Sequence, residues 1–243
     1  MIDIGRALQH PFQDQNWLSK LGIGALIDIV PILNFAGVGY MVEHENNVKQ
    51  GSDVPLPTWD NLGNLFTLGL KLVVVFFIYL LPILALFCIL TVVAGGFAAL
   101  TQGGDSASAG DAASAGFGIL SITISCLSII YVVFFQYLYP AIFIQFARTK
   151  EIAPCLRLGE VFAIARKSSG DYILIFLVLI GISLAISIIA SILAVTVVGL
   201  CLLVPLALLA TPYLNVVIAH LCGQYDRNVD PVTTPRPDFV SPA

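Results

Sequence analysis

The sequence predicts an all-α integral membrane protein, a bundle of four transmembrane helices preceded by one apolar segment that proline and glycine interrupt. Hydrophobic residues make up 58% of the 243 residues and charged residues only 11%, whereas soluble domains carry about 25% charged residues. The mean hydropathy is +0.94. Long uncharged runs exceed the roughly 20 residues that cross a hydrocarbon core, and backbone in lipid must be hydrogen-bonded internally, so these runs predict helices.

The first apolar segment, residues 18–42, is the exception among these runs. Asp28 lies in its middle, Pro31 follows, and glycines occur on both sides. This segment is therefore predicted either as a full span or as a broken, re-entrant one. Four uninterrupted spans are predicted after it, at about residues 68–95, 117–146, 172–195 and 199–222. The last two come from one uncharged run that is too long for a single crossing, with a tight turn near residues 196–199.

The connections between the predicted spans differ in composition. Residues 59–70 and 158–167 repeat apolar side chains at helical spacing, which predicts two amphipathic helices that lie in the headgroup zone or pack on the bundle. Residues 101–116 are rich in Gly, Ala and Ser and predict a flexible external loop. Residues 1–225 are predicted as one transmembrane domain, and residues 226–243, with four prolines, as a disordered cytoplasmic tail.

Basic residues gather on one side of the predicted topology. Five lie in one connection: Arg148, Lys150, Arg157, Arg166 and Lys167. The connections predicted on the opposite side contain neither Lys nor Arg. The positive-inside rule then predicts a plasma or inner membrane protein with cytoplasmic long loops and a cytoplasmic C-terminus. A net charge of −4 argues against nucleic acid as a partner.

A short motif recurs along the chain. Pro31-Ile-Leu-Asn34 is repeated as Pro212-Tyr-Leu-Asn215, with a weaker version at Pro140, and a polar stretch follows each copy. The recurrence predicts an internal repeat of span, amphipathic helix and span. It favours a first segment that crosses fully, whereas Arg6 and Lys20 favour a cytoplasmic N-terminus and a re-entrant segment. Both alternatives stay open at this point.

Several motifs together resemble a known family. They are Pro11-Phe12, Trp17, the Pro31–Asn34 motif, Gly39-Tyr40, Leu56-Pro57-x-Trp59 and His220-Leu-x-Gly-Gln224. In combination they resemble the multi-pass bacterial and archaeal membrane proteins grouped as domain of unknown function 4013, over about residues 5–228. The resemblance implies the multi-pass topology, and it implies no catalytic residue because the family has no established activity.

Residues suited to catalysis or metal binding are sparse. His10 and His44 are expected in solvated polar segments, and His220 as a hydrogen-bonded residue at the membrane interface. No second histidine stands at i+3 or i+4 from another, the five cysteines form no CxxC pair, and no hydrolase, zinc-protease or phosphate-binding motif is present. The sequence therefore predicts a protein that is not an enzyme and holds no cofactor or metal.

Asp28 is the candidate intramembrane polar residue. A carboxylate at mid-membrane costs about 2.5–3.5 kcal/mol on insertion scales, so it should face the bundle interior, with Asn34, Asn215 and Gln136 as candidate partners. If the first segment is re-entrant, Asp28 instead lies near water.

Small residues predict helix-packing faces. In lipid no hydrophobic effect drives helices together, so association depends on the close packing that small side chains allow. The two predicted faces consist of Ser121, Ser125 and Ser128 on one span and Ser183, Ser187, Ala190 and Ala194 on another.

Two functions lead, and a membrane enzyme ranks third. The first is a non-catalytic scaffold or accessory subunit of a membrane complex, with membrane lipids and other membrane subunits as partners. The alternative is a small-solute or ion transporter or channel with a site near Asp28 at the repeat interface.

Overall fold

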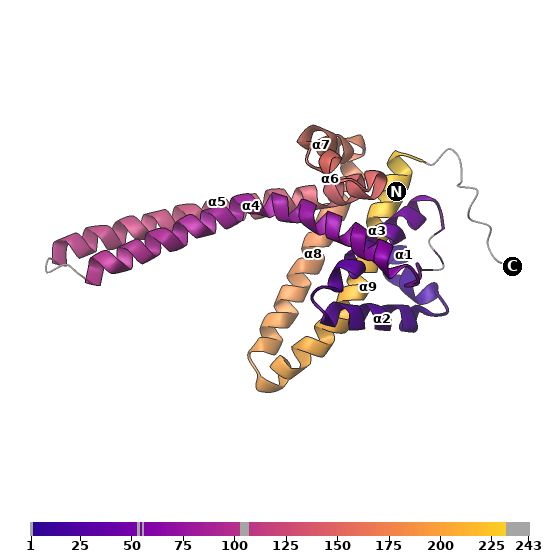
Figure 1. Cartoon of the computed structure of the whole chain (residues 1–243), viewed down its shortest axis with the longest axis horizontal. Helices are drawn as coiled ribbons and strands as arrows, with labels where there is room; N and C mark the ends of the chain where they lie inside the picture. Colours follow the sequence, from indigo (N-terminus) through magenta and orange to yellow (C-terminus); the bar gives the residue numbers. More distant parts are fainter. Residues whose placement is uncertain (1, 53, 55, 103–106, 232–243) are drawn as a thin grey trace. The chain divides into compact units, whose positions relative to one another are not determined.

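The computed structural model describes residues 2–52, 54, 56–102 and 107–231, and these residues fold into helices without a strand (Figure 1). The helices are α1 (Ile4–Gln9), η1 (His10–Gln13), α2 (Trp17–Ile29), α3 (Asn34–Lys49), α4 (Leu62–Gln102), α5 (Ala107–Thr149), α6 (Ile152–Cys155), α7 (Leu158–Lys167), α8 (Ser169–Ala194) and α9 (Val197–Val229). The chain divides into two compact units, the large unit (Met1–Val75 with Leu138–Ala243) and the hairpin unit (Phe76–Tyr137).

Four of the helices are long and apolar enough to cross a membrane. They are Leu62–Ala94 of α4, Gly118–Thr149 of α5, Ser169–Ala194 of α8 and Cys201–Val229 of α9. Their surfaces carry many exposed large apolar side chains, such as Val92, Ile119 and Ile192. Large exposed apolar surfaces of this kind suit hydrocarbon rather than water, so these helices indicate a membrane location.

The first apolar segment is two helices rather than one. Helix α2 ends at Ile29 after 13 residues, and α3 begins at Asn34 and has 16 residues. Val30 adopts an extended conformation directly before Pro31, as expected because the proline ring disfavours helical geometry in the preceding residue. Neither helix reaches the roughly 20 residues of a full span, so the segment is not one continuous transmembrane helix.

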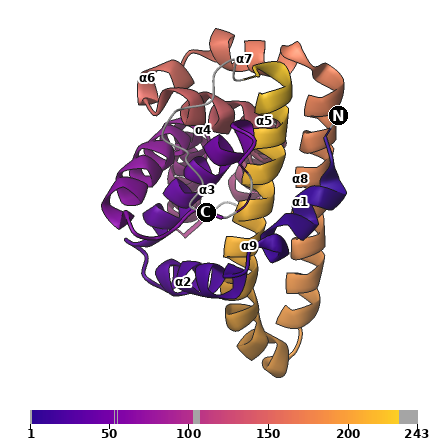
Figure 2. The same cartoon turned by 90° about the vertical axis from the view of Figure 1, so that its right-hand side faces the viewer.

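Helix α9 is central to the large unit, where α1, α2, α3 and α8 pack against it (Figure 2). Helices α3 and α4 approach so closely at Gly39 and Gly69 that a side chain fits at neither position. A Cβ atom on Gly39 would lie 1.8 Å from the Leu65 carbonyl oxygen, and one on Gly69 would lie 1.6 Å from that of Phe35. The two glycines thus fix the crossing of α3 and α4.

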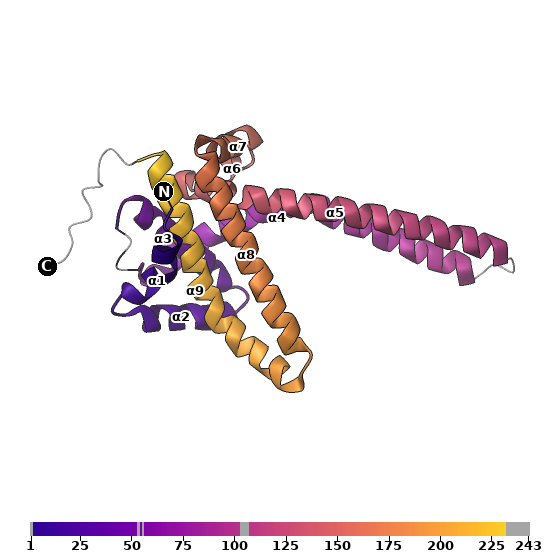
Figure 3. The same cartoon turned by 180° about the vertical axis from the view of Figure 1, so that it is seen from behind.

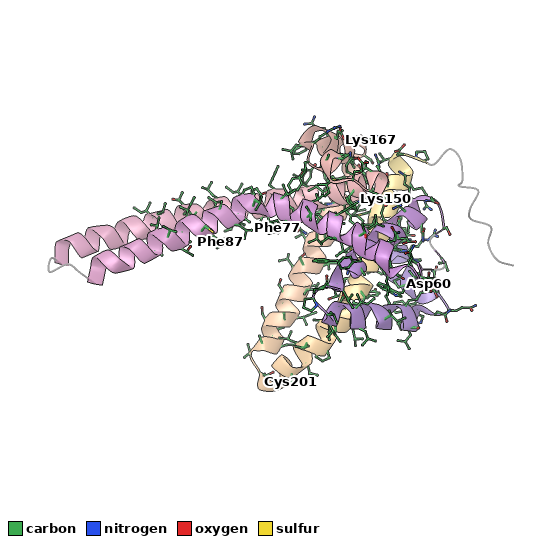
Figure 4. All side chains as sticks on the ribbon, viewed as in Figure 1. Asp60, Phe77, Phe87, Lys150, Lys167 and Cys201 are labelled. Atoms are coloured by element: carbon green, nitrogen blue, oxygen red, sulfur yellow. The ribbon has the colours of Figure 1, made fainter. Side chains whose placement is uncertain are left out.

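The hairpin unit consists of the second part of α4 and the first part of α5, which lie side by side (Figures 1 and 3). The rings of Phe76 and Phe135 meet edge to face at 6.1 Å, and the Tyr131 hydroxyl donates to the Tyr79 carbonyl oxygen. Phe77 and Phe87 point away from the ribbon (Figure 4) and are 55% and 51% exposed. The hairpin is thus held by a narrow contact line and presents apolar side chains outward.

Three connections differ from the sequence-based expectations. Helix α5 begins at Ala107, so most of the expected loop at residues 101–116 is helical, which agrees with the high helix propensity of its alanines. Residues 59–70 do not form a separate helix, since α4 runs unbroken from Leu62. Helix α9 continues to Val229 into the expected tail, whose remaining residues 232–243 lie outside the described part.

Candidate functional site

The motif residues of the first half of the chain converge in the large unit. The rings of Tyr40 and Trp59 stack at 4.3 Å. The Tyr40 hydroxyl donates to the Pro57 carbonyl oxygen at 3.0 Å, and the Trp59 indole N–H donates to the Lys20 carbonyl oxygen at 2.9 Å. These bonds anchor the irregular segment before α4 onto α2 and α3, so the Gly39-Tyr40 and Leu56-Pro57-x-Trp59 motifs serve packing.

Asp14 binds three donors beside this aromatic pair. Its carboxylate accepts from the Lys20 ammonium at 2.8 Å, the Asn16 amide at 2.6 Å and the Leu56 amide at 2.7 Å. Burial opposes ionisation, but the hydrogen bonds from Lys20, Asn16 and Leu56 outweigh it and lower the pKa of Asp14 below its usual value. Asp14 is therefore an ionised anchor that joins the N-terminal segment to the segment before α4.

The three histidines of the chain form one buried stack. The ring centroids of His10 and His220 lie 4.4 Å apart, those of His10 and His44 5.0 Å apart, and the planes differ by only 11° and 10°. All three side chains are fully buried. They come from η1, α3 and α9, so the expectation of a solvated His44 is wrong. In this stack the N-terminal segment, α3 and α9 meet.

The stack is not arranged as a metal site. An imidazole binds a metal through a nitrogen lone pair in the ring plane at about 2.0–2.1 Å. Nearly parallel rings 4.4–5.0 Å apart direct their lone pairs along separate parallel planes, so the three nitrogens cannot converge on one ion. Among the described residues, no group of three His, Cys, Asp or Glu side chains is placed to hold a metal.

Gln224 links the histidine stack to the start of the chain. Its amide nitrogen donates to the Asp3 carbonyl oxygen at 3.1 Å and approaches Nδ1 of His220 at 3.3 Å, while its amide oxygen accepts from the Asp3 N–H at 2.7 Å. Gly223 gives α3 room, because a Cβ there would lie 2.7 Å from Cβ of Val48. The His220-Leu-x-Gly-Gln224 motif thus joins the N-terminus and α3 to α9.

A buried ion network lies one turn further along α9. Asp226 is fully buried. It accepts from Nε and a terminal nitrogen of Arg148, the former at 2.8 Å, and pairs with Lys49 at 3.0 Å. Asp230 lies 3.9 Å from Lys49 and 3.7 Å from Arg148. This ion network, formed by Asp226, Asp230, Lys49 and Arg148, joins the ends of α3, α5 and α9.

Glu45 and His44 lie on α3 and are both fully buried. Burial raises the pKa of Glu45 well above its usual value, and the nearby carboxylate of Asp226 raises it further. Burial also lowers the pKa of His44 well below its usual value, with the neighbouring His10 and His220 adding to the effect. Burial therefore favours the neutral form of both side chains.

Asp28 contacts one of its three expected partners in the large unit, Asn34, and shares a cavity with a second, Asn215. The Asn34 amide nitrogen lies 3.3 Å from its carboxylate, and Asn215 lines the same small cavity, which also borders Trp59 and Pro212. Burial raises the pKa of Asp28 to about 6. The cavity measures about 10 Å³, the lower limit for one water molecule. Gln136 belongs to the hairpin unit.

The other predicted site residues take different positions. Arg148 is part of the ion network, Arg157 pairs with Glu160 at 2.9 Å on the surface, and Lys150, Arg166 and Lys167 are exposed. The serine hydroxyls bond within their own helices: Ser121 to Gly118, Ser125 to Ser121, Ser183 to Leu179 and Ser187 to Ser183. Ser128 is buried, Ala190 is half-buried and Ala194 is exposed.

The histidine stack and the ion network were not predicted from the sequence. Their members come from segments far apart in the sequence, apart from Asp226 and Asp230 near the end of α9, and only the tertiary fold brings these segments together. One signal was available, since all three histidines sit beside motif residues: His10 before Pro11-Phe12, His44 four residues after Tyr40, and His220 within its own motif.

The four apolar helices found in the described part of the chain are long enough to cross a membrane, and they indicate a multi-pass helical membrane protein. The chain belongs to the family described as protein of unknown function (DUF4013), whose model matches residues 23–195. The match includes Gly39-Tyr40 and Leu56-Pro57-x-Trp59, while Pro11-Phe12, Trp17 and the His220–Gln224 motif lie outside it. No curated protein matches the chain. No solved structure matches it either.

Proposed function

We propose that the protein is a non-catalytic scaffold or accessory subunit of a membrane complex, in which the large unit is a fixed platform. The observation that carries this proposal is the ion network. Asp226 is fully buried and bridges Lys49 and Arg148, so it ties α3, α5 and α9 together at their polar ends. Breaking a buried pair by removing one partner typically costs about 3–5 kcal/mol.

A fixed platform differs from what transport requires. Alternating access moves one group of helices against another around a central site. Here the residues of the family motifs pack α9 against the N-terminal segment and α3, and the histidine stack and ion network join the same helices. The conspicuous residues of the chain therefore support packing, which favours a structural role.

A transporter is the second candidate, and Asp28 is the observation that favours it. The carboxylate lies shortly before a helix break at Pro31, as in the broken helices of many transporters, and its pKa of about 6 suits proton exchange near neutral pH. The cavity of about 10 Å³ beside it is too small for an organic solute. This alternative therefore reduces to an ion or proton site.

The two functions are separated by reconstitution. We expect proteoliposomes of the purified wild-type chain to move neither protons nor a panel of ions and small solutes, and we expect Asp28→Asn to express like wild type and to melt no lower. Proton or solute flux that wild type supports and Asp28→Asn abolishes would establish the transporter instead. Asp60→Asn, an exposed carboxylate change (Figure 4), controls for loss of one negative charge.

The charge asymmetry favours an orientation with α6, α7 and the end of α9 in the cytoplasm. In that orientation the exposed Arg157, Arg166 and Lys167 are available to anionic lipid or to a partner subunit.

A further inference from the structure

A polar pocket of about 150 Å³ lies in the large unit, apart from the histidine stack and Asp28. One wall is a face of α3, because Glu43, Asn46, Asn47 and Gln50 follow the i, i+3, i+4, i+7 spacing. Asn64 from the first turn of α4, the apolar Leu68 one turn further along α4 and Lys150 just beyond α5 complete the lining. Lys150 extends from the end of α5 in Figure 4.

The lining combines two opposite charges with four carboxamides. Glu43 supplies a carboxylate and Lys150 an ammonium, and each amide offers both donors and acceptors. Burial raises the pKa of Glu43, while Lys150 acts in the opposite direction and favours its ionised form. A pocket of this kind can satisfy both a cation and an anion at once.

The backbone holds Lys150 in place at this pocket. Its φ is 55°, and its N–H donates to the Phe146 carbonyl oxygen at 2.7 Å, which caps α5. Glycine is the usual residue at such a left-handed cap because a side chain is disfavoured there. The chain has a lysine instead, so its ammonium stands at the rim of the pocket at the expense of backbone strain.

We propose that this pocket binds a small zwitterion with a primary ammonium and an oxyanion. Glu43 receives the ammonium, Lys150 the oxyanion, and the carboxamides the remaining polar atoms. A volume of about 150 Å³ lies below the roughly 300–1,000 Å³ of pockets for drug-sized ligands, so the ligand is small. A simple anion bound to Lys150 would leave the carboxylate of Glu43 without a positive partner. A simple cation bound to Glu43 would leave the ammonium of Lys150 without a negative one.

Two sources supply this chemistry. One is a free amino-acid-like solute, and the other is the phosphoethanolamine headgroup of a lipid. We favour the lipid headgroup, because the pocket borders the end of α5 and the end of a spanning helix lies at the level of the headgroups.

The first test is a ligand series on the wild-type protein in detergent, measured by isothermal titration calorimetry. The probes are phosphoethanolamine, glycine, phosphocholine, ethanolamine and inorganic phosphate. We expect phosphoethanolamine or glycine to bind at least about tenfold more tightly than ethanolamine, phosphate or the quaternary phosphocholine, which has no N–H to donate. Equal binding of phosphate or ethanolamine alone, or no binding of either zwitterion, overturns the proposal.

The second test uses variants on the better zwitterion. Glu43→Gln and Lys150→Gln should each weaken binding by about tenfold or more, whereas Asp60→Asn and Lys167→Gln remove the same charges elsewhere and should leave it unchanged. Lys150→Gly relieves the backbone strain, so it should melt no lower than wild type and still lose binding. Unchanged affinity in Lys150→Gly overturns the assignment even if the Glu43 variant fails to fold.

The source is then decided in nanodiscs that contain either phosphatidylethanolamine or phosphatidylcholine as the only zwitterionic lipid. Competition of phosphatidylethanolamine with the soluble probe assigns the pocket to the headgroup. Equal probe binding in both lipids assigns it to a free solute.

Discussion

Asp226→Asn is the change that tests the ion network most severely. It removes the charge shared by Lys49 and Arg148, whose side chains are only 15% and 16% exposed. Removing one partner of a fully buried pair costs about 3–5 kcal/mol. Two effects reduce this cost here: Asp230 lies within 4 Å of both cations, and loss of the Asp226 charge lowers the pKa of Glu45 and so favours its ionised form. We therefore expect a loss of about 2–3 kcal/mol.

The assay is reversible unfolding in mixed micelles by titration with dodecyl sulfate, supported by thermal melting in mild detergent. For a chain of this size, a loss of 2–3 kcal/mol corresponds to a fall in Tm of about 4–12 °C. Asp230→Asn is the matched control. Its side chain is 54% exposed, so it should cost less than about 0.5 kcal/mol.

The double variant Asp226→Asn with Glu45→Gln examines the compensation by Glu45. With no carboxyl group left at position 45 to ionise, the loss should exceed the sum of the two single losses. An Asp226→Asn variant as stable as wild type, or as mildly affected as Asp230→Asn, would refute the claim that this network ties the three helices.

Three further predictions follow from the large unit. The lowered pKa of His44 means that the unfolded chain binds a proton that the native state excludes, so the free energy of unfolding should fall as pH drops below about 6.5, and His44→Phe should flatten that fall. Asp28 has a raised pKa, so protonation of its carboxyl group stabilises the native state. This stabilisation is complete below about pH 3.8 and is lost as pH rises through about 6. Asp28→Asn should remove this pH-dependent change in the free energy of unfolding, which is about 1–2 kcal/mol after discounting for partial exposure. Gly39→Ala should cost more than about 3 kcal/mol because its Cβ would overlap the Leu65 carbonyl, whereas Gly181→Ala, which meets nothing within 4 Å, should be neutral or slightly stabilising. For the His44, Asp28 and Gly39 variants, behaviour equal to that of wild type in the same micelle titration would contradict the stated cause.

The helical membrane class and the four spans could be predicted from the sequence because both depend on local properties. Length, hydropathy and the absence of charge act within a single segment, and Pro31 marks the break between α2 and α3 as a local steric effect. The ends of the helices were predicted less accurately. Helix α5 already begins among the alanines after residue 106, and α9 extends past Asp226, which the ion network holds in place.

The polar core could not be predicted in the same way. Asp226 follows a long apolar span and begins a polar tail, a position typical of a solvated residue, and only the approach of Lys49 and Arg148 from distant segments allows its burial. The histidine stack likewise joins residues separated by most of the chain. Asp28 and Asn34 were paired correctly because a proline turn brings them together locally.

The mass of the particle extracted from native membranes in mild detergent, measured by native mass spectrometry, tests the proposed scaffold role most directly. We expect a complex in which this chain keeps a second membrane polypeptide at fixed stoichiometry, and in which Asp226→Asn weakens that complex while Asp230→Asn does not. A particle that contains this chain alone, from membranes where it is expressed at its natural level, would contradict the scaffold role.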